Sequence, residues 1–295
     1  MALVTGIALA LLAILLAWAA PSVLARSAWV DQSPRAGVVL WQALAVAAVL
    51  AAVGAALAAP EEALRAWTGS VQFGTGLLIA AGLAGLLAGV IAIRLVWVTV
   101  RLGLRTRRRR AHHAQMLHLL DVADPEDRRM HVLTGPVPMA YCIPGRSRKV
   151  VVTDSALALL DTAEVDAVIE HERAHLRARH DLVLEAFTAL HASFPRFVRS
   201  RLALDAVHRL LEMLADDGAA ARVGPGALSS ALAKLGSTGE STTIEARRAR
   251  LGPAVDEHRK LVGAGAYLTA VAVLAVPTLV LVEPWLQAAV AAISG

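Results

Sequence analysis

The sequence predicts a mainly α integral membrane protein, in which four transmembrane helices carry one inserted α+β domain. Two observations predict this class. Hydrophobic residues make up 57% of the 295 residues, above the roughly 45–50% of an ordinary soluble domain. The excess is gathered into four long apolar stretches, and a long polar segment separates the third stretch from the fourth.

Each apolar stretch is close to the roughly 20 residues that a helix needs to cross a bilayer. The first contains no lysine or arginine, whereas a cleaved signal peptide begins with positive charge, so we expect a retained span. The predicted spans are about 2–20, 36–59, 71–100 and 261–282. The corresponding regions are a membrane part at 1–103, a polar domain at 104–260, and a fourth span with a short tail at 261–295.

Arginines indicate on which side of the membrane each part lies, because cytoplasmic loops are enriched in them. Six arginines follow the third predicted span: Arg101, Arg105, Arg107, Arg108, Arg109 and Arg110. We therefore expect a multi-pass protein of the cell membrane, with the polar domain in the cytoplasm and both termini outside. The net charge of +5 comes with no nucleic-acid-binding motif. We expect the lipid bilayer as a partner and no direct contact with nucleic acid.

The polar domain is predicted to begin with a β-hairpin. Residues 131–143 are proline-rich and extended, which suits an edge strand or an irregular strand rather than a central one. A turn follows, and the β-branched residues at 149–153 predict the second strand. Cys142 is the only cysteine, which excludes an internal disulfide and any zinc site built from several cysteines.

Helices are predicted to follow the hairpin. Asp154 or Ser155 is expected to cap a short helix. Asp161, with Glu164 three residues later, has the pattern of a capping box at the start of the next helix. A further helix is expected from about 202 to 222. The composition of 236–243 predicts a mobile loop, and the apolar segment 182–198 suits either a core position or one against the bilayer.

Two histidines four residues apart carry the main chemical signal. His171 and His175 leave the same face of the helix that begins at Asp161, so both imidazoles can bind one cation. Glu172 lies about 100° from His171 around the helix axis. From there its carboxylate can take a proton from a zinc-bound water and deliver it to the leaving amine. Two solvated surface histidines are the alternative, which the apolar flank at 163–169 disfavours.

A catalytic zinc ion takes three protein ligands and keeps one position open. Glu212, on the helix predicted at 202–222, is the expected third ligand of one Zn²⁺ per chain. Asp216 lies one turn further along and can fix the tautomer of a ligand imidazole through a hydrogen bond, with the neighbouring Asp217 as the alternative. Asp181, which follows the motif, is a second candidate for that role or for a helix cap.

Other residues are weaker candidates. His208 and Tyr141 are candidate donors to the transition state, and a structural role is the alternative for His208. His180 is expected at the surface, because it lies off the metal face of the helix. The histidines after the arginine run are expected at the membrane interface: His112, His113 and His118. The strand around 137–141 is expected to hold a substrate by backbone pairing.

The motif sequences resemble those of the integral-membrane gluzincin metallopeptidases. His-Glu-Arg-Ala-His is followed by Leu-Arg-Ala-Arg-His-Asp, and Glu-Met-Leu-Ala-Asp lies downstream. That group includes the CAAX prenyl proteases, the HtpX heat-shock proteases and the bla/mec-type antirepressor peptidases, and the span layout is most similar to the last. The resemblance implies His171, His175 and Glu212 as zinc ligands, Glu172 as general base and Asp216 as support.

The resemblance also implies a protein or peptide substrate, such as a bla/mec-type transcriptional repressor. The antibiotic sensors of that group carry an extracellular penicillin-binding domain after the last span, and none follows the fourth predicted span here. We therefore expect a different input signal. The sequence predicts a membrane-embedded zinc endopeptidase. The alternative is a non-catalytic membrane signalling or scaffold protein with a structural metal site, in which Glu172 would not be needed as a base.

Overall fold

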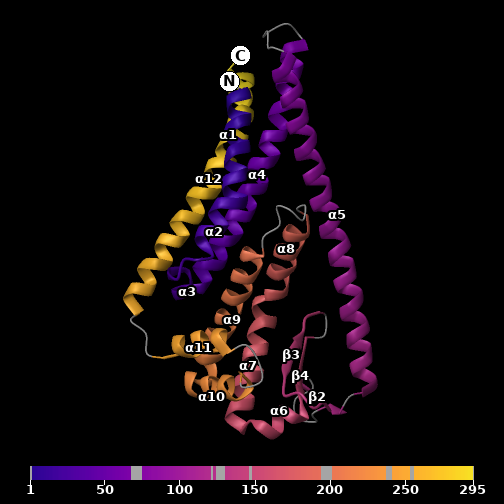
Figure 1. Cartoon of the computed structure of the whole chain (residues 1–295), viewed down its shortest axis with the longest axis vertical. Helices are drawn as coiled ribbons and strands as arrows, with labels where there is room; N and C mark the ends of the chain where they lie inside the picture. Colours follow the sequence, from indigo (N-terminus) through magenta and orange to yellow (C-terminus); the bar gives the residue numbers. More distant parts are fainter. Residues whose placement is uncertain are drawn as a thin grey trace. The chain divides into compact units, whose positions relative to one another are not determined.

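The computed structural model describes residues 2–67, 75–120, 122–123, 130–145, 148–193, 201–236, 241–252 and 256–294. The chain divides into two compact units, and each is described by itself. Unit 1 comprises Met1–Val98, Leu190–Ala203 and Arg259–Gly295, and unit 2 comprises Thr99–Ala189 and Leu204–His258. Both units are mostly helical, and the sheet among the described residues belongs to unit 2 (Figure 1).

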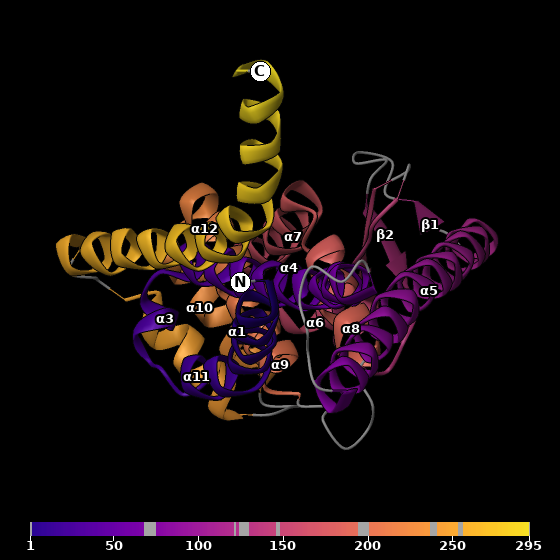
Figure 2. The same cartoon turned by 90° about the horizontal axis from the view of Figure 1, so that it is seen from above.

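Unit 1 begins with a helical rod made of α1 (Ala2–Ile14) and α2 (Ala20–Leu24). A π-helical segment, Leu15–Ala19, joins them directly before Pro21. Proline has no backbone N–H to donate, and a wider turn is a common way for a helix to accommodate it. After the short α3 (Trp29–Gln32), α4 (Pro34–Trp67) runs beside α1 (Figure 2). Its buried stripe repeats every three or four residues and is rich in alanine, which permits close packing: Ala36, Leu40, Ala43, Leu44, Ala47 and Ala51.

Three helical segments among the described residues are long and apolar enough to cross a membrane, which suggests a membrane-associated protein. They are Thr5–Leu24, Pro34–Ala56 and Arg259–Val280, the last within α12 (Asp256–Ser294). These segments correspond to the first, second and fourth predicted spans. The first residues of the predicted third span, 71–74, lie outside the described residues, and the rest of that span belongs to α5 (Thr75–Leu120). The expected count of four spans is therefore not confirmed.

The sheet of unit 2 has the strand order β1-β2-β4-β3. The strands are β1 (Val122–Ala123), β2 (Met130–Leu133), β3 (Ala140–Ile143) and β4 (Lys149–Thr153). As expected of the hairpin, β3 pairs antiparallel with β4. The expectation of one extended strand over 131–143 is wrong, because β2 pairs parallel with the other side of β4. Pro136 and Pro138 lie between the two strands, and prolines cannot donate to a strand ladder.

The alternation of side chains gives the two faces of the sheet different neighbours. On one face, Cys142 packs with Val150 against Ile169 and Leu176 of α7 (Thr162–Ala178). Tyr141 lies on the opposite face, where it packs with Val151. All five residues of β4 are buried, as a central strand requires. The fold therefore turns Cys142 toward α7 and Tyr141 away from it.

The helices α6 and α7 begin with side-chain caps. Thr153 caps α6 (Asp154–Leu159) by accepting a hydrogen bond from the backbone N–H of Ala156. The expected cap, Asp154 or Ser155, was one or two residues too late, because Thr153 is the last residue with extended backbone. The capping box that begins α7 is confirmed, with Asp161 and Glu164 bonding each other's backbone N–H at 2.9 and 2.8 Å.

Two further contacts fix α7 within unit 2. The carboxylate of Glu164 accepts hydrogen bonds of 2.6 Å from Ser230 and from Lys234 of α10 (Pro225–Gly236). On α9 (Leu202–Val223), Gly218 lies so close to α7 that an added Cβ would be 3.0 Å from the Cβ of Ala174. Ala174 sits between the two candidate ligand histidines of α7. The close approach of the two helices therefore occurs at the level of the candidate site.

Helices occupy parts of two segments for which the sequence predicted no helix. Arg179 adopts a left-handed conformation with φ 53°, which ends α7, and α8 (His180–Ser193) begins at the next residue. Residues 194–198 of the apolar segment lie outside the described residues, and Phe187 within α8 is buried. The loop was expected to continue to residue 243, but α11 (Ser241–Arg250) already begins at Ser241. Residues 237–240 lie outside the described part.

Candidate metal centre

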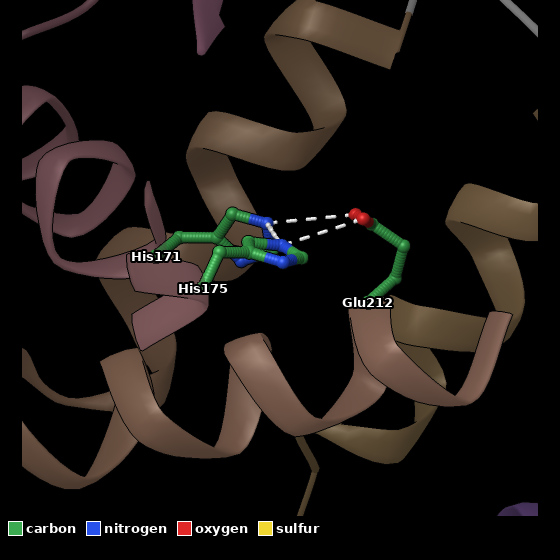
Figure 3. A group of neighbouring side chains, drawn as sticks. All are labelled: His171, His175 and Glu212. Atoms are coloured by element: carbon green, nitrogen blue, oxygen red, sulfur yellow. Dashed lines mark hydrogen bonds and ion pairs between the residues drawn. The ribbon is translucent and has the colours of Figure 1, made fainter. Parts of the chain in front are cut away.

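Three side chains that the sequence predicts as zinc ligands converge in unit 2 (Figure 3). His171 and His175 come from α7, and their Nε2 atoms lie 3.2 Å apart. Glu212 comes from α9; its Oε1 lies 3.3 Å from Nε2 of His175 and its Oε2 lies 3.5 Å from Nε2 of His171. Two imidazole nitrogens and one carboxylate are a donor set of catalytic zinc sites. The three residues therefore fit a zinc ion in both chemistry and placement.

Asp216 supports this group from one turn further along α9. Its Oδ1 lies 3.0 Å from Nδ1 of His171, the ring nitrogen that faces away from the other ligands. Asp216 is almost completely buried, and a buried carboxylate needs charged or hydrogen-bonding partners to stabilise its charge. A carboxylate at Nδ1 favours the tautomer of His171 that leaves Nε2 free to bind a metal.

Arg247 is a residue of the site that sequence reasoning missed. From α11, its Nε and Nη2 each donate a hydrogen bond of 2.7 Å to the carboxylate of Asp216. Its Nη1 lies 3.2 Å from Oε2 of Glu212. Thr242 and Glu245 have the spacing of a capping box, and this signal could have indicated α11 as a helix rather than a loop.

His180 was expected at the surface, and that expectation is wrong. Its side chain is buried, with a relative exposure of 4%. Nδ1 of His180 lies 3.0 Å from Nδ1 of His175, and the two rings are perpendicular with centroids 4.8 Å apart. The left-handed turn at Arg179 explains the error, because it interrupts the helical periodicity from which the surface position was inferred.

Glu172 lies on α7 between the two histidines and meets the sheet through Cys142. The thiol of Cys142 and the carboxylate of Glu172 interact electrostatically. Burial raises the pKa of Glu172 above its usual range, although His171 acts in the opposite direction. A raised pKa makes the carboxylate a stronger base, which suits a general acid–base group.

The charges of the site act strongly on one another. Burial disfavours the charged form of His171, but Asp216 and Glu212 outweigh this and raise its pKa to about 9. Burial lowers the pKa of His175 to about 4. Burial would raise the pKa of Glu212, but the two histidines and Arg247 lower it to about 2. Glu212 is thus held as a carboxylate, the form that binds a metal.

Three other residues that were predicted for the site lie away from the candidate ligands or at the edge of the site. Asp181 binds Arg110, with Oδ2 3.0 Å from Nη1, instead of a ligand imidazole. Tyr141 contacts His113 of α5 through its hydroxyl at 3.1 Å. Because Tyr141 lies on the face of the sheet opposite Cys142, its predicted role as a transition-state donor is not consistent with its position. His208 is mostly exposed, and its Nε2 lies 4.0 Å from Oε1 of Glu212.

The histidines of α5 are placed only in part. His112 and His113 are exposed, and the contact of His113 with Tyr141 gives it a neighbour within unit 2. The side chain of His118 lies outside the described residues. Their expected position at the membrane interface therefore stays a prediction.

The comparison with known families agrees with this geometry. Residues 104–235 match the model of peptidase family M48. The matched region contains the three candidate ligands and Glu172, and it ends before Arg247. The match indicates a metallopeptidase of the membrane-type gluzincin kind, and peptidases of this family depend on zinc. The expected bla/mec antirepressor group is not confirmed. Neither the curated proteins nor the solved structures gave a match.

Proposed function

We propose that this protein is a membrane-embedded, zinc-dependent endopeptidase that hydrolyses peptide bonds within a protein substrate. One observation carries the proposal: the convergence of His171, His175 and Glu212, with Glu172 on the same helix as the two histidines. The match to peptidase family M48 supports the same chemistry independently of this geometry.

The residues divide the work of peptide hydrolysis between them. His171, His175 and Glu212 would hold one Zn²⁺, which supplies Lewis-acid polarisation of the substrate carbonyl and lowers the pKa of water. Glu172 takes the proton of the attacking water and delivers it to the nitrogen of the leaving amine. Its raised pKa makes the carboxylate a stronger base and so favours the first of these transfers.

The sheet offers a place for the substrate backbone. Among the described strands, β3 is at the end of the sheet and pairs on one side only, with β4. An extended peptide can add to such an edge through backbone hydrogen bonds. Cys142 of β3 interacts electrostatically with Glu172, so a peptide paired along β3 would lie near the proposed base.

The cellular setting is part of the proposal. The three apolar segments support membrane embedding. The arginine run from Arg101 to Arg110 supports a cytoplasmic peptidase domain with both termini outside, by the charge rule for membrane proteins. The resemblance of the motifs supports a regulatory substrate, such as a repressor of the bla/mec type.

The test compares the purified full-length wild type with Glu172→Gln. Glutamine keeps the size of the side chain but cannot take a proton, so we expect equal zinc content and a loss of proteolysis of at least about 100-fold, the range of general-base catalysis. Zinc content is measured by elemental analysis, and proteolysis with an unfolded protein substrate. Equal proteolysis by both proteins would contradict the role of Glu172. Zinc in both proteins without proteolysis in either would favour a structural metal site.

A further inference from the structure

The two ligand histidines are each approached by a polar side chain at Nδ1, the ring nitrogen opposite the metal-binding Nε2. For His171 this side chain is Asp216, at 3.0 Å. For His175 it is His180, whose Nδ1 also lies at 3.0 Å. Asp216 reaches His171 because it lies one turn of α9 after Glu212. His180 reaches His175 because the chain changes direction at the end of α7.

The backbone of Arg179 produces the second pair. Its left-handed conformation ends α7 four residues after His175 and starts α8 at His180. The imidazole of His180 is thereby directed back onto the ring of His175, perpendicular to it. His180 is 4% exposed, so its contact with His175 is shielded from water.

We propose that His180 is a positioning residue that accepts a hydrogen bond from Nδ1–H of His175 and so directs the Nε2 lone pair of His175 toward zinc. The inference rests on the proposed zinc site. His180 is not one of the three candidate ligands; it acts through the orientation and the tautomer of His175.

Proton counting determines which ring donates. A neutral imidazole carries one N–H and one lone pair. If Nε2 of His175 is the metal ligand, its single proton is on Nδ1, and the facing Nδ1 of His180 must supply the lone pair. His180 then carries its own proton on Nε2. Two nitrogens 3.0 Å apart are at hydrogen-bond distance, which fits this arrangement.

The charges around the site explain why a neutral acceptor suits His175. Glu212 and Asp216 already place two carboxylates against the histidine pair, and Arg247 compensates part of that charge. A third carboxylate at Nδ1 of His175 would add another buried negative charge, which is costly unless it is paired. An imidazole provides the same acceptor geometry without a charge.

The test replaces His180 by one residue that can accept a hydrogen bond and by one that cannot. In His180→Asn, the amide Oδ1 can take the place of Nδ1, whereas His180→Phe keeps a ring but removes the acceptor. Zinc affinity of the purified full-length protein is measured by competition with a fluorescent chelator. We expect His180→Phe to weaken zinc binding about 10- to 100-fold, as loss of a partner of a ligand typically does, and His180→Asn to stay within a few-fold of the wild type.

Two controls accompany the measurement. His112→Phe changes an exposed histidine of α5 and is expected to leave zinc affinity unchanged. The thermal unfolding of each metal-free variant reports its folding separately from its metal binding. If His180→Phe does not fold, His180→Ala serves as the acceptor-free variant with the same expected loss.

The outcomes separate this inference from the proposed function. A wild type that binds no zinc would contradict the metal site itself. Wild-type zinc affinity in the folded acceptor-free variant would overturn the role of His180 and leave the metal site intact. Equal losses in His180→Asn and His180→Phe would also overturn it, because the acceptor would then make no difference.

Discussion

Arg247 holds Asp216 with two parallel hydrogen bonds of 2.7 Å, although the two residues lie on different helices, α11 and α9. Both side chains are largely buried. Such bidentate pairs are among the strongest hydrogen-bonded contacts in proteins. The contact fixes Asp216 against His171 and links α11 to the candidate metal ligands.

Arg247→Ala should therefore destabilise the protein and weaken zinc binding together. Breaking a buried ion pair leaves an unpaired charge and typically costs about 3–5 kcal/mol, and we expect zinc affinity to fall about 10-fold or more. Arg248→Ala, on the same helix but exposed, is the matched control and should change neither. Adding Asp216→Asn to Arg247→Ala should restore part of the stability, because it removes the unpaired carboxylate. Additive losses in urea unfolding would contradict the pairing.

Gly218 determines how closely α9 approaches α7. Its hydrogen faces Ala174, which lies between His171 and His175. Gly218→Leu should separate the helices, reduce the free energy of unfolding by about 1–3 kcal/mol, and weaken zinc binding because Glu212 moves with α9. Gly226→Leu on α10 is the control, since a Cβ there meets nothing within 4 Å. Unchanged zinc affinity in Gly218→Leu would show that the metal site tolerates the separation.

Glu164 gives the domain a specific sensitivity to acid. Hydrogen bonds from Lys234 and Ser230 lower its pKa from 4.5 to about 2. A lowered pKa in the folded state stabilises the protein above the pKa of the unfolded state, and this contribution is lost as the pH falls from about 4.5 toward 2. The stability gap between wild type and Glu164→Gln should be constant above about pH 5 and narrow below it. Thermal unfolding of the zinc-free proteins measures the gap, with exposed Glu245→Gln as the control.

Zinc binding should release about one proton near neutral pH. The raised pKa of His171, about 9, means that a proton occupies this ligand at pH 7, whereas the lowered pKa values of His175 and Glu212, about 4 and 2, leave these two free. The logarithm of the zinc affinity should rise by about one per pH unit from about 5 to 8 and level off above 9. Calorimetry in two buffers of different ionisation enthalpy counts the proton.

A control for this proton release is Asp216→Asn. The loss of the carboxylate should lower the pKa of His171 and so reduce the number of protons released at pH 7. A zinc affinity that does not vary with pH between 6 and 8 would show that His171 is already neutral in the metal-free protein.

Local patterns in the sequence were sufficient to predict the three residues that converge as a candidate metal site. The spacing of His171 and His175, and of Glu212 and Asp216, depends only on helical periodicity, which both helices keep. The capping box at Asp161 is equally local. Such features involve residues within one or two turns, and the physical rules for them are the same in most proteins.

The sequence could not indicate contacts that depend on a change of chain direction or on pairing between residues far apart in the sequence. His180 reaches His175 because of one left-handed residue, Arg179, where a non-glycine residue is uncommon. The parallel pairing of β2 with β4 brings together strands that a simple hairpin pattern would not join. Arg247 resembles its exposed neighbours in composition, and only the folded position of Asp216 distinguishes it.

The partly buried position of Cys142 near Glu172 has a practical consequence for labelling the protein. Burial, together with the negative charge of Glu172, raises the pKa of the thiol to about 12, so Cys142 remains a thiol and resists alkylation and oxidation in the native state. The chain has no other cysteine. Maleimide labelling would therefore count the molecules in which β3 has come away from α7, and it would do so without any engineered probe.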